Sequence, residues 1–188
     1  FVFMSAAAVK FKTQNAYGRS KKMAENCIID SGLPHVILRT PLIIGKGGEE
    51  FDRFVDYVNK FPLINPVFGN GRPVKRPIAI QDVVSAVIRI LEKAPAESKL
   101  YEIACREAIS LDDFIDIVNR CLGKKRVKIH MPLNISLLLA SCAEKLLGDK
   151  SPVTRDILLG LNEDVCLDID KSLQELRIEP MNISDAVR

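Results

Sequence analysis

The chain has 188 residues, enough for one large domain or for one and a half at about 150 residues each. Apolar residues make up 47% of it and charged residues 27%, so the chain can bury a core and is not disordered. Because its 27 basic residues are balanced by 24 acidic ones, the net charge of +3 gives no reason to expect nucleic-acid binding.

The first half of the chain alternates predicted strands and helices. Residues 1–5 read as a strand buried on both faces, and because such a strand needs neighbours, we expect the chain to be the C-terminal part of something longer. The further predicted elements are a helix over 15–29, a strand over 36–38, a loop over 41–48, a helix from 51, a long connection over 62–75, an extended stretch over 74–80 and a helix over 82–93.

The second half continues the alternation, which favours an α/β fold. A strand is predicted over 100–103, and Ser110 is expected to cap a helix that Gly123 ends. The remaining predicted elements are a strand over 127–129, a helix over 134–147, a helix opened by Ser151 and Pro152 and running to 161, a strand over 165–169 and a last helix capped by Asp170 and running to 176.

The cysteines, histidines and apolar runs exclude several classes of protein. The five cysteines are odd in number and form no C-x-x-C pair, so we expect buried reduced thiols in a cytoplasmic protein, not disulfides or a zinc site (Cys27, Cys105, Cys121, Cys142 and Cys166). His35 and His130 have no partner at ligand spacing, so no metal is expected. The longest apolar run, 137–143, is far shorter than the ~20 residues that span a bilayer, so no membrane span is expected.

The chemical motif of the chain is Tyr17-Gly-Arg-Ser-Lys21, at the head of the predicted helix. Four residues make about one helical turn, so Tyr17 and Lys21 project from the same face. A nearby ammonium favours the phenolate and is expected to lower the pKa of Tyr17 from its ordinary value of about 10, which makes this phenol a candidate acid/base. Because the pattern alone also occurs on ordinary helices, the alternative is a surface tyrosine beside a solvated lysine.

Four segments in a fixed order carry a resemblance to a known family. They are the strand end at Ser5, Tyr17-Gly-Arg-Ser-Lys21-x-x-Ala-Glu25, Leu38-Arg-Thr-Pro41-Leu-Ile-Ile-Gly45 and Pro77-Ile-Ala-Ile-Gln-Asp82-Val-Val. With them the chain resembles the extended and atypical branch of the short-chain dehydrogenase/reductase superfamily, which includes NAD-dependent epimerases and dehydratases and the nucleotide-binding accessory subunit of respiratory complex I. The resemblance implies the C-terminal part of a doubly wound, parallel-sheet domain of Rossmann type over 1–92, and a small, mostly helical substrate-side lobe over 93–188.

The resemblance also implies roles for individual residues. Tyr17 would be the catalytic acid/base, and Lys21 would bind the nicotinamide-ribose hydroxyls of NAD or NADP and lower the pKa of the tyrosine. The segment expected to lie along the nicotinamide consists of Arg39, Thr40, Pro41 and Leu42. Asp82 is interpreted as a structural residue at the start of a helix, where a carboxylate suits the helix dipole.

Two departures from the family pattern concern the catalytic hydroxyl and the phosphate site. Relatives carry a hydroxyl residue at a place that aligns with Ala7, so Ser5, twelve residues before Tyr17, is the remaining candidate. Gly45-Lys-Gly-Gly48 lacks G-x-G-x-x-G spacing and follows the wrong strand, so it is not a dinucleotide fingerprint.

Basic residues after Gly71 are candidates for substrate binding. In epimerase-like relatives a basic residue at this place contacts the substrate diphosphate, which implies that role for Arg72 and Arg76, and a guanidinium suits it. A solvated loop is the alternative reading.

The resemblance implies an NAD(P)-dependent oxidoreductase or epimerase/dehydratase acting on a hydroxyl or carbonyl of a small molecule, such as a sugar nucleotide or a sterol. The alternative is a non-catalytic NAD(P)H-binding structural or assembly protein, which Ala7 and the segment Pro77-Ile-Ala-Ile80 favour. In relatives the helix with the tyrosine and lysine often packs against its own copy, so a homodimer is a further expectation.

Overall fold

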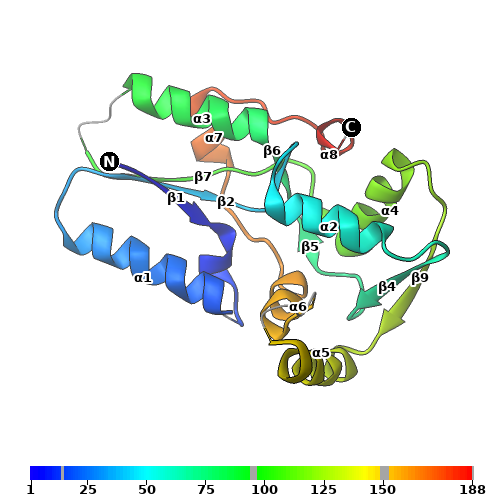
Figure 1. Cartoon of the computed structure of the whole chain (residues 1–188). Helices are drawn as coiled ribbons and strands as arrows, with labels where there is room; N and C mark the ends of the chain where they lie inside the picture. Colours follow the sequence, from blue (N-terminus) through cyan, green and yellow to red (C-terminus); the bar gives the residue numbers. More distant parts are fainter. Residues whose placement is uncertain (14, 94–96, 149–152, 188) are drawn as a thin grey trace.

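A parallel three-stranded sheet, in the order β1-β2-β7, lies at the centre of one half of the fold. Its strands are β1 (Val2–Ala6), β2 (Val36–Thr40) and β7 (Lys99–Glu102) in a computed structural model that describes residues 1–13, 15–93, 97–148 and 153–187. One face is covered by α1 (Ala16–Asp30) and the other by α3 (Ile80–Lys93) and α7 (Asp170–Leu176) (Figure 1). Parallel strands with helices on both faces confirm the predicted α/β class.

The two faces of this sheet differ in chemistry because side chains alternate along a strand. Val36 and Leu38 of β2 are buried in an apolar core with residues of α3 and α7. Arg39, the residue after Leu38, points to the opposite face and contacts α1. The face toward α1 is therefore polar at the end of the strands where the predicted site lies.

Three two-stranded ladders occur in the rest of the described chain. They are β3 (Ile43–Ile44) with β6 (Ile78–Ala79) and β4 (Ile64–Phe68) with β9 (Val127–Met131), both parallel, and β5 (Val74–Lys75) with β8 (Ile109–Ser110), antiparallel. Next to them α2 (Glu49–Asn59) packs on α4 (Leu111–Cys121), where Phe54 and Phe114 stack with ring centroids 4.9 Å apart. These helices and ladders enclose a second apolar core.

Four further helical segments complete the described structure: η1 (Ala7–Lys10), α5 (Leu133–Leu147), α6 (Arg155–Leu161) and α8 (Ile183–Ala186). α5 and α6 pack together below the ladders in Figure 1, and the start of α1 lies beside α6. Among the described residues, no helix combines the length and the apolar character needed to cross a bilayer.

The two cores are not divided at one point in the sequence. The first core joins Leu38 of β2 to Leu173 and Leu176 of α7, and the second joins Phe54 of α2 to Phe114 of α4. Each core therefore takes residues from both sides of the predicted boundary at 92, and the assignment of 1–92 and 93–188 to two functional parts stays a prediction.

The strand predicted over 165–169 is wrong, although its pattern was read correctly. Val165, Leu167 and Ile169 are buried and alternate with exposed neighbours, as in a half-buried strand. The segment nevertheless forms no ladder, because its amides are satisfied individually: Val165 donates to the carbonyl oxygen of Val74 and Asp168 donates to the carboxylate of Glu102. One backbone carbonyl and one carboxylate thus accept from amides that a neighbouring strand would otherwise bind.

The helix caps were predicted with mixed success. Ser110 accepts a hydrogen bond from the amide of Asp113 and caps α4, as expected. Ser151 and Pro152 lie outside the described residues, and the helix that they were expected to open begins at Arg155, where Thr154 accepts from the amide of Ile157. Asp170 is not a cap, because it already lies in the first turn of α7.

The expectation of buried thiols is wrong for most of the cysteines. All five are free, but only Cys105 is buried, whereas the other four are exposed.

Candidate functional site

The first turn of α1 is fixed by its cap and by η1. The buried side chain of Asn15 accepts a hydrogen bond from the amide of Gly18 at 2.8 Å and so caps the helix. A Cβ atom at Gly18 would lie 2.6 Å from the carbonyl oxygen of Ala8, so only glycine lets η1 approach this closely. Tyr17 thus lies on a turn whose backbone is fixed from two sides.

This contact predicts the effect of replacing Gly18 with alanine. Helix propensity alone would stabilise the fold by about 1 kcal/mol. The clash with Ala8 must displace η1 or the first turn, and such overpacking typically costs ~1–3 kcal/mol, so we expect a net loss of stability in urea unfolding. Lys22→Ala, on an exposed part of the same helix, is the control and should change stability by less than about 0.5 kcal/mol. A Gly18→Ala variant more stable than the parent would contradict the close contact.

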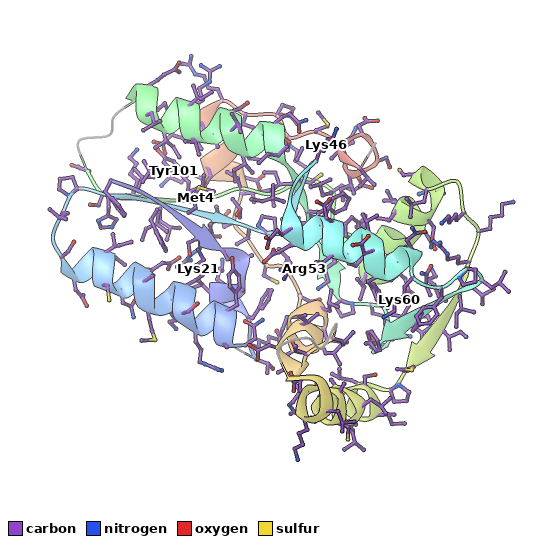
Figure 2. All side chains as sticks on the ribbon, viewed as in Figure 1. Met4, Lys21, Lys46, Arg53, Lys60 and Tyr101 are labelled. Carbon is purple, nitrogen blue, oxygen red and sulfur yellow. The ribbon has the colours of Figure 1, made fainter. Side chains whose placement is uncertain are left out.

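Tyr17 and Lys21 lie on the same side of α1. The Nζ atom of Lys21 is 5.8 Å from the centroid of the Tyr17 ring and donates a hydrogen bond to the carbonyl oxygen of Met4 at 3.0 Å. Figure 2 shows Lys21 on α1 next to β1, which carries Met4. Tyr17 is 44% exposed, so its side chain is neither sealed in the core nor fully solvated. A phenol and an ammonium are therefore presented together at the surface next to the end of β1.

The pKa of Tyr17 is raised, which corrects the expectation that Lys21 lowers it. Burial is the larger cause, and the negative charge of Glu50 at the start of α2 adds to it. Lys21 does not offset these effects, because its ammonium is directed to the carbonyl oxygen of Met4. In this structure the phenol is therefore held in its protonated form, and it is a weaker acid than a free tyrosine.

Glu50→Gln is expected to lower the pKa of Tyr17 but to leave it above the ordinary value. The substitution removes the carboxylate that opposes the phenolate, whereas the larger contribution from burial remains. The measurement is the ultraviolet difference titration of the protein against its Tyr17→Phe variant, which isolates one phenol among three tyrosines in a chain without tryptophan. Asp52→Asn in the same turn is the control, and an equal shift in both variants would contradict a specific effect of Glu50.

Ser5 and Arg39 join a buried polar network with Glu25 and Glu102. The hydroxyl of Ser5 donates to Glu25 at 2.5 Å, and Arg39 binds both oxygens of Glu25, through Nε at 2.9 Å and Nη2 at 2.6 Å. Arg39 also donates from Nη1 to Glu102 at 3.0 Å. Glu25 lies eight residues after Tyr17, about two helical turns away. The structure therefore gives Ser5 and Arg39 partners within the fold, where the sequence predicted contacts with substrate and cofactor.

This network holds charge in the interior. Glu25 is only 3% exposed and Glu102 only 5%. Burial opposes ionisation of Glu25, but hydrogen bonds from Arg39 and Ser5 outweigh it and hold the pKa of its carboxyl below the ordinary value. The same bonds raise the pKa of Arg39. The sequence alone assigns no role to Glu25 or Glu102. A glutamate inside a predicted buried strand, such as Glu102 in the strand predicted over 100–103, is a signal that could indicate a buried ion pair.

The segment after Arg39 leads from β2 to the second core. Thr40 is buried, and its hydroxyl donates to the carbonyl oxygen of Ser5 at 3.4 Å. Pro41 is half-buried, and Leu42 packs against the second core while its carbonyl oxygen accepts from the amide of Ile78. Their predicted place along a nicotinamide stays a prediction.

The two arginines proposed for substrate binding differ in their surroundings. Arg72 is exposed and its amide donates to the side chain of Asn70. Arg76 is half-buried, and its guanidinium donates to the carbonyl oxygen of Arg106 at 2.9 Å. The Nε atom of Arg76 is buried and has no hydrogen-bond partner within the described chain. Carbonyl oxygens bind the guanidinium of Arg76 without neutralising its charge.

Tyr17 and Lys21 fit one part of a nicotinamide cofactor. The ammonium of Lys21 and the phenol of Tyr17 are adjacent donors beside a half-exposed surface, which suits the paired hydroxyls of a ribose. Of the other residues predicted to line the nicotinamide, Arg39 and Thr40 already bind groups of the protein, and Pro41 and Leu42 are apolar. These two donors suit a ribose, and their contact with the nicotinamide end of the cofactor stays a prediction.

A family model provides independent information on the chain. The model described as the NAD dependent epimerase/dehydratase family matches residues 4–104, more than half of the chain. The match includes the end of β1 and all of α1, β2 and β7, and with them both members of the Tyr17 and Lys21 pair. A comparison with curated proteins finds no significant match.

Solved structures share the fold at low sequence identity. UDP-glucuronic acid 4-epimerase from Bacillus cereus, in complex with NAD, has a TM-score of 0.68 at 18% identity and covers 100% of this chain and 58% of its own. A nucleoside-diphosphate-sugar epimerase from Staphylococcus aureus has a TM-score of 0.71 at 13% identity, over 99% of this chain and 63% of its own. UDP-glucose 4-epimerase from Thermotoga maritima, with UDP-glucose, has a TM-score of 0.66 at 15% identity, over 100% and 60%. The chain thus spans about three fifths of the length of these proteins.

Proposed function

This chain belongs to the NAD-dependent epimerase/dehydratase family, and we propose that it supplies the acid/base pair of an NAD-dependent enzyme acting on a hydroxyl or carbonyl carbon of a sugar nucleotide. Tyr17 is the proton donor and acceptor in this proposal, and Lys21 binds the cofactor ribose. The observation that carries the proposal is that Tyr17 and Lys21 lie on the same side of α1. The ammonium of Lys21 is 5.8 Å from the ring centroid of the half-exposed Tyr17.

The bound nicotinamide would accept and return a hydride. The residues of this chain handle the proton: Tyr17 takes it from a substrate hydroxyl or gives it to a carbonyl, in the direction that the reaction requires. Because the free protein holds the phenol protonated, the charge of Lys21 is needed to make the phenolate accessible, and its Nζ atom must then exchange the carbonyl oxygen of Met4 for other partners. Arg72 and Arg76 supply positive charge for a diphosphate.

In the proposed division of labour, residues 1–92 contribute the cofactor side and 93–188 contribute most of the substrate side. The support is the position of Tyr17 and Lys21 on α1, which packs on the parallel sheet, and the grouping of α4, β9, α5 and α6 beyond it (Figure 1). Sugar nucleotides are favoured as substrates because the structural neighbours include enzymes crystallised with UDP-glucuronic acid and UDP-glucose.

The proposal is tested by incubating the protein with NAD and a panel of UDP-sugars and separating the products by chromatography. We expect conversion of at least one sugar nucleotide and quenching or enhancement of NADH fluorescence on binding. Unchanged sugars throughout the panel, together with unchanged NADH fluorescence, would refute both the activity and the cofactor assignment.

A non-catalytic NAD(H)-binding protein is the second candidate, and one observation favours it. The hydroxyl of Ser5 is bound to Glu25, and the residues that follow it, Ala6, Ala7 and Ala8, carry no hydroxyl. The end of β1 therefore offers no free side-chain hydroxyl to hold a substrate oxygen beside Tyr17. This candidate predicts tight NADH binding without turnover of any substrate in the same assay.

A further inference from the structure

The loop before Tyr17 is held by two carboxylates from a distant part of the sequence. Glu163 accepts from the amides of Lys12 and Thr13, at 3.1 and 2.9 Å, and uses a different oxygen for each. Asp156 of α6 accepts from the amide of Ala16 through Oδ2 at 2.8 Å. Backbone amides directly before Tyr17 are therefore bound to side chains about 140–150 residues away in sequence.

The backbone that carries Glu163 is held by its neighbours. The backbone carbonyl oxygen of Glu163 accepts a hydrogen bond from Nζ of Lys75 at 2.7 Å, and burial lowers the pKa of Lys75 to about 8. The residues on either side are also bound, since Asn162 donates to the carbonyl oxygen of Phe68 and Asp164 accepts from the amide of Val74. Residues 162–164 thus connect the strands β4 and β5 to the loop before Tyr17.

Asp156 is similarly connected to the start of α1. The side chain of Asn15 donates to the carbonyl oxygen of Asp156 at 3.3 Å while its own oxygen caps the helix. A Cβ atom at Gly160, one turn after Asp156, would lie 3.1 Å from the same Asn15 amide, so α6 approaches the loop closely. The backbone of residues 12–16, as far as it is described, is therefore placed by α6 and the segment after it.

We propose that Asp156 and Glu163 are positioning residues that set where the phenol of Tyr17 stands relative to Lys21. The inference builds on the proposed function, in which Tyr17 transfers the proton. Charged acceptors form stronger hydrogen bonds with backbone amides than neutral ones, and the two carboxylates bind three amides within five residues of Tyr17. A misplacement of about 1 Å can cost ~100-fold in rate, so such contacts can control catalysis without touching the substrate.

The geometry distinguishes the two carboxylates in a mutagenesis experiment. Glu163 uses both oxygens, so Glu163→Gln keeps only one acceptor and turns an amino group toward an amide donor. Asp156 uses only Oδ2 for Ala16, so Asp156→Asn can keep its bond by presenting the remaining oxygen. Glu163→Gln and Asp156→Ala should therefore disturb the loop, whereas Asp156→Asn should behave like the parent. Glu92→Gln, in an exposed ion pair with Arg89, is the control.

Three measurements are made on the protein and these variants: hydrogen exchange of the amides of Lys12 and Thr13, the titration of Tyr17, and turnover with NAD and UDP-sugars. In Glu163→Gln we expect exchange about tenfold faster, a pKa of Tyr17 shifted down as the phenol becomes more exposed, and kcat reduced at least tenfold with KM and NADH binding unchanged. In Asp156→Asn, unlike in Asp156→Ala, the amide exchange, the Tyr17 titration and the turnover should all match those of the parent.

The outcomes separate this inference from the proposed function. Exchange and Tyr17 titration in Glu163→Gln that match those of Glu92→Gln would overturn the positioning role, whatever the turnover. A parallel loss of NADH binding, melting temperature and kcat would also overturn it, because it would indicate general unfolding. If the parent converts no sugar nucleotide but the loop responds as expected, the positioning stands and the proposed activity fails.

Discussion

Replacing Arg39 with methionine is expected to destabilise the protein by about 3–5 kcal/mol, the typical cost of removing one member of a buried ion pair. The guanidinium binds Glu25 through two bonds and Glu102 through one, and these glutamates are 3% and 5% exposed. Methionine fills a similar volume but leaves two carboxylates without their principal cation. Lys10, which binds Glu102 at 3.0 Å, and the charge of Lys22 near Glu25 would remain. Urea unfolding at neutral pH measures the loss.

The pH dependence of this loss follows from the pKa of Glu25. In the parent that pKa is lowered, so the stabilisation is complete above the unfolded value of about 4.3 and is lost as the pH falls through the folded value. Without Arg39, burial raises the pKa of Glu25, and the variant then loses stability as the pH rises above about 4.3. The stability difference between parent and variant should therefore be large at pH 7 and should narrow toward pH 4.

Arg106→Met is the matched control for Arg39→Met. Arg106 also binds two carboxylates, those of Glu179 and Asp170, but their side chains are 77% and 85% exposed. Such surface ion pairs contribute about 0–1 kcal/mol, so this variant should unfold close to the parent. A similar effect of both substitutions would contradict the idea that burial makes the Arg39 network important.

The contrast between Arg39 and the segment 165–169 shows what the sequence could predict. The alternation of Val165, Leu167 and Ile169 correctly indicated which side chains are buried, because burial depends on local spacing. Whether a strand forms depends on which groups meet the backbone amides, and here these are Val74 and Glu102, which lie far away in sequence. Arg39 was likewise misplaced because Glu25 and Glu102 meet it only after the chain has folded.

The ladder strand β4 was missed for a related reason. Pro66 lies within it and lacks an amide hydrogen, which argues against a strand in a sequence-based reading. In the structure β4 pairs with β9 along one edge only, so the other edge can accept a proline. The residues around Pro66 therefore predict a connection, because the sequence of a strand does not show how many neighbouring strands it pairs with.

Within the candidate site, the sequence could predict only the relative position of residues that lie one helical turn apart. Tyr17 and Lys21 share a side because their spacing requires it. The surroundings of the phenol could not be predicted, since Glu50 and the carbonyl oxygen of Met4 come from other elements, and they decide the direction of the pKa shift. Local spacing thus gave the pair, and tertiary contacts determine its chemistry.

Tyr17→Phe is expected to reduce turnover of the sugar nucleotide by about 10²–10⁴-fold, the usual contribution of a positioned acid/base. The substitution removes only the hydroxyl, so α1, its cap at Asn15 and the contact of Gly18 with Ala8 are unchanged. NADH binding should survive, because Lys21 keeps its ammonium. The measurements are steady-state turnover with NAD and the accepted UDP-sugar, and NADH fluorescence titration.

Tyr57→Phe is the control for this experiment. Tyr57 contacts Phe54 and Phe68 in the second core, and its pKa is strongly raised by burial, so its phenol does not titrate near neutral pH. Its loss should leave turnover unchanged, which shows that removing a phenol from the fold is not itself damaging. Full activity in Tyr17→Phe would remove the acid/base role from this residue. NADH binding by parent and variant alike, with no turnover in either, would instead establish the non-catalytic alternative, because the ribose contact of Lys21 does not require the phenol.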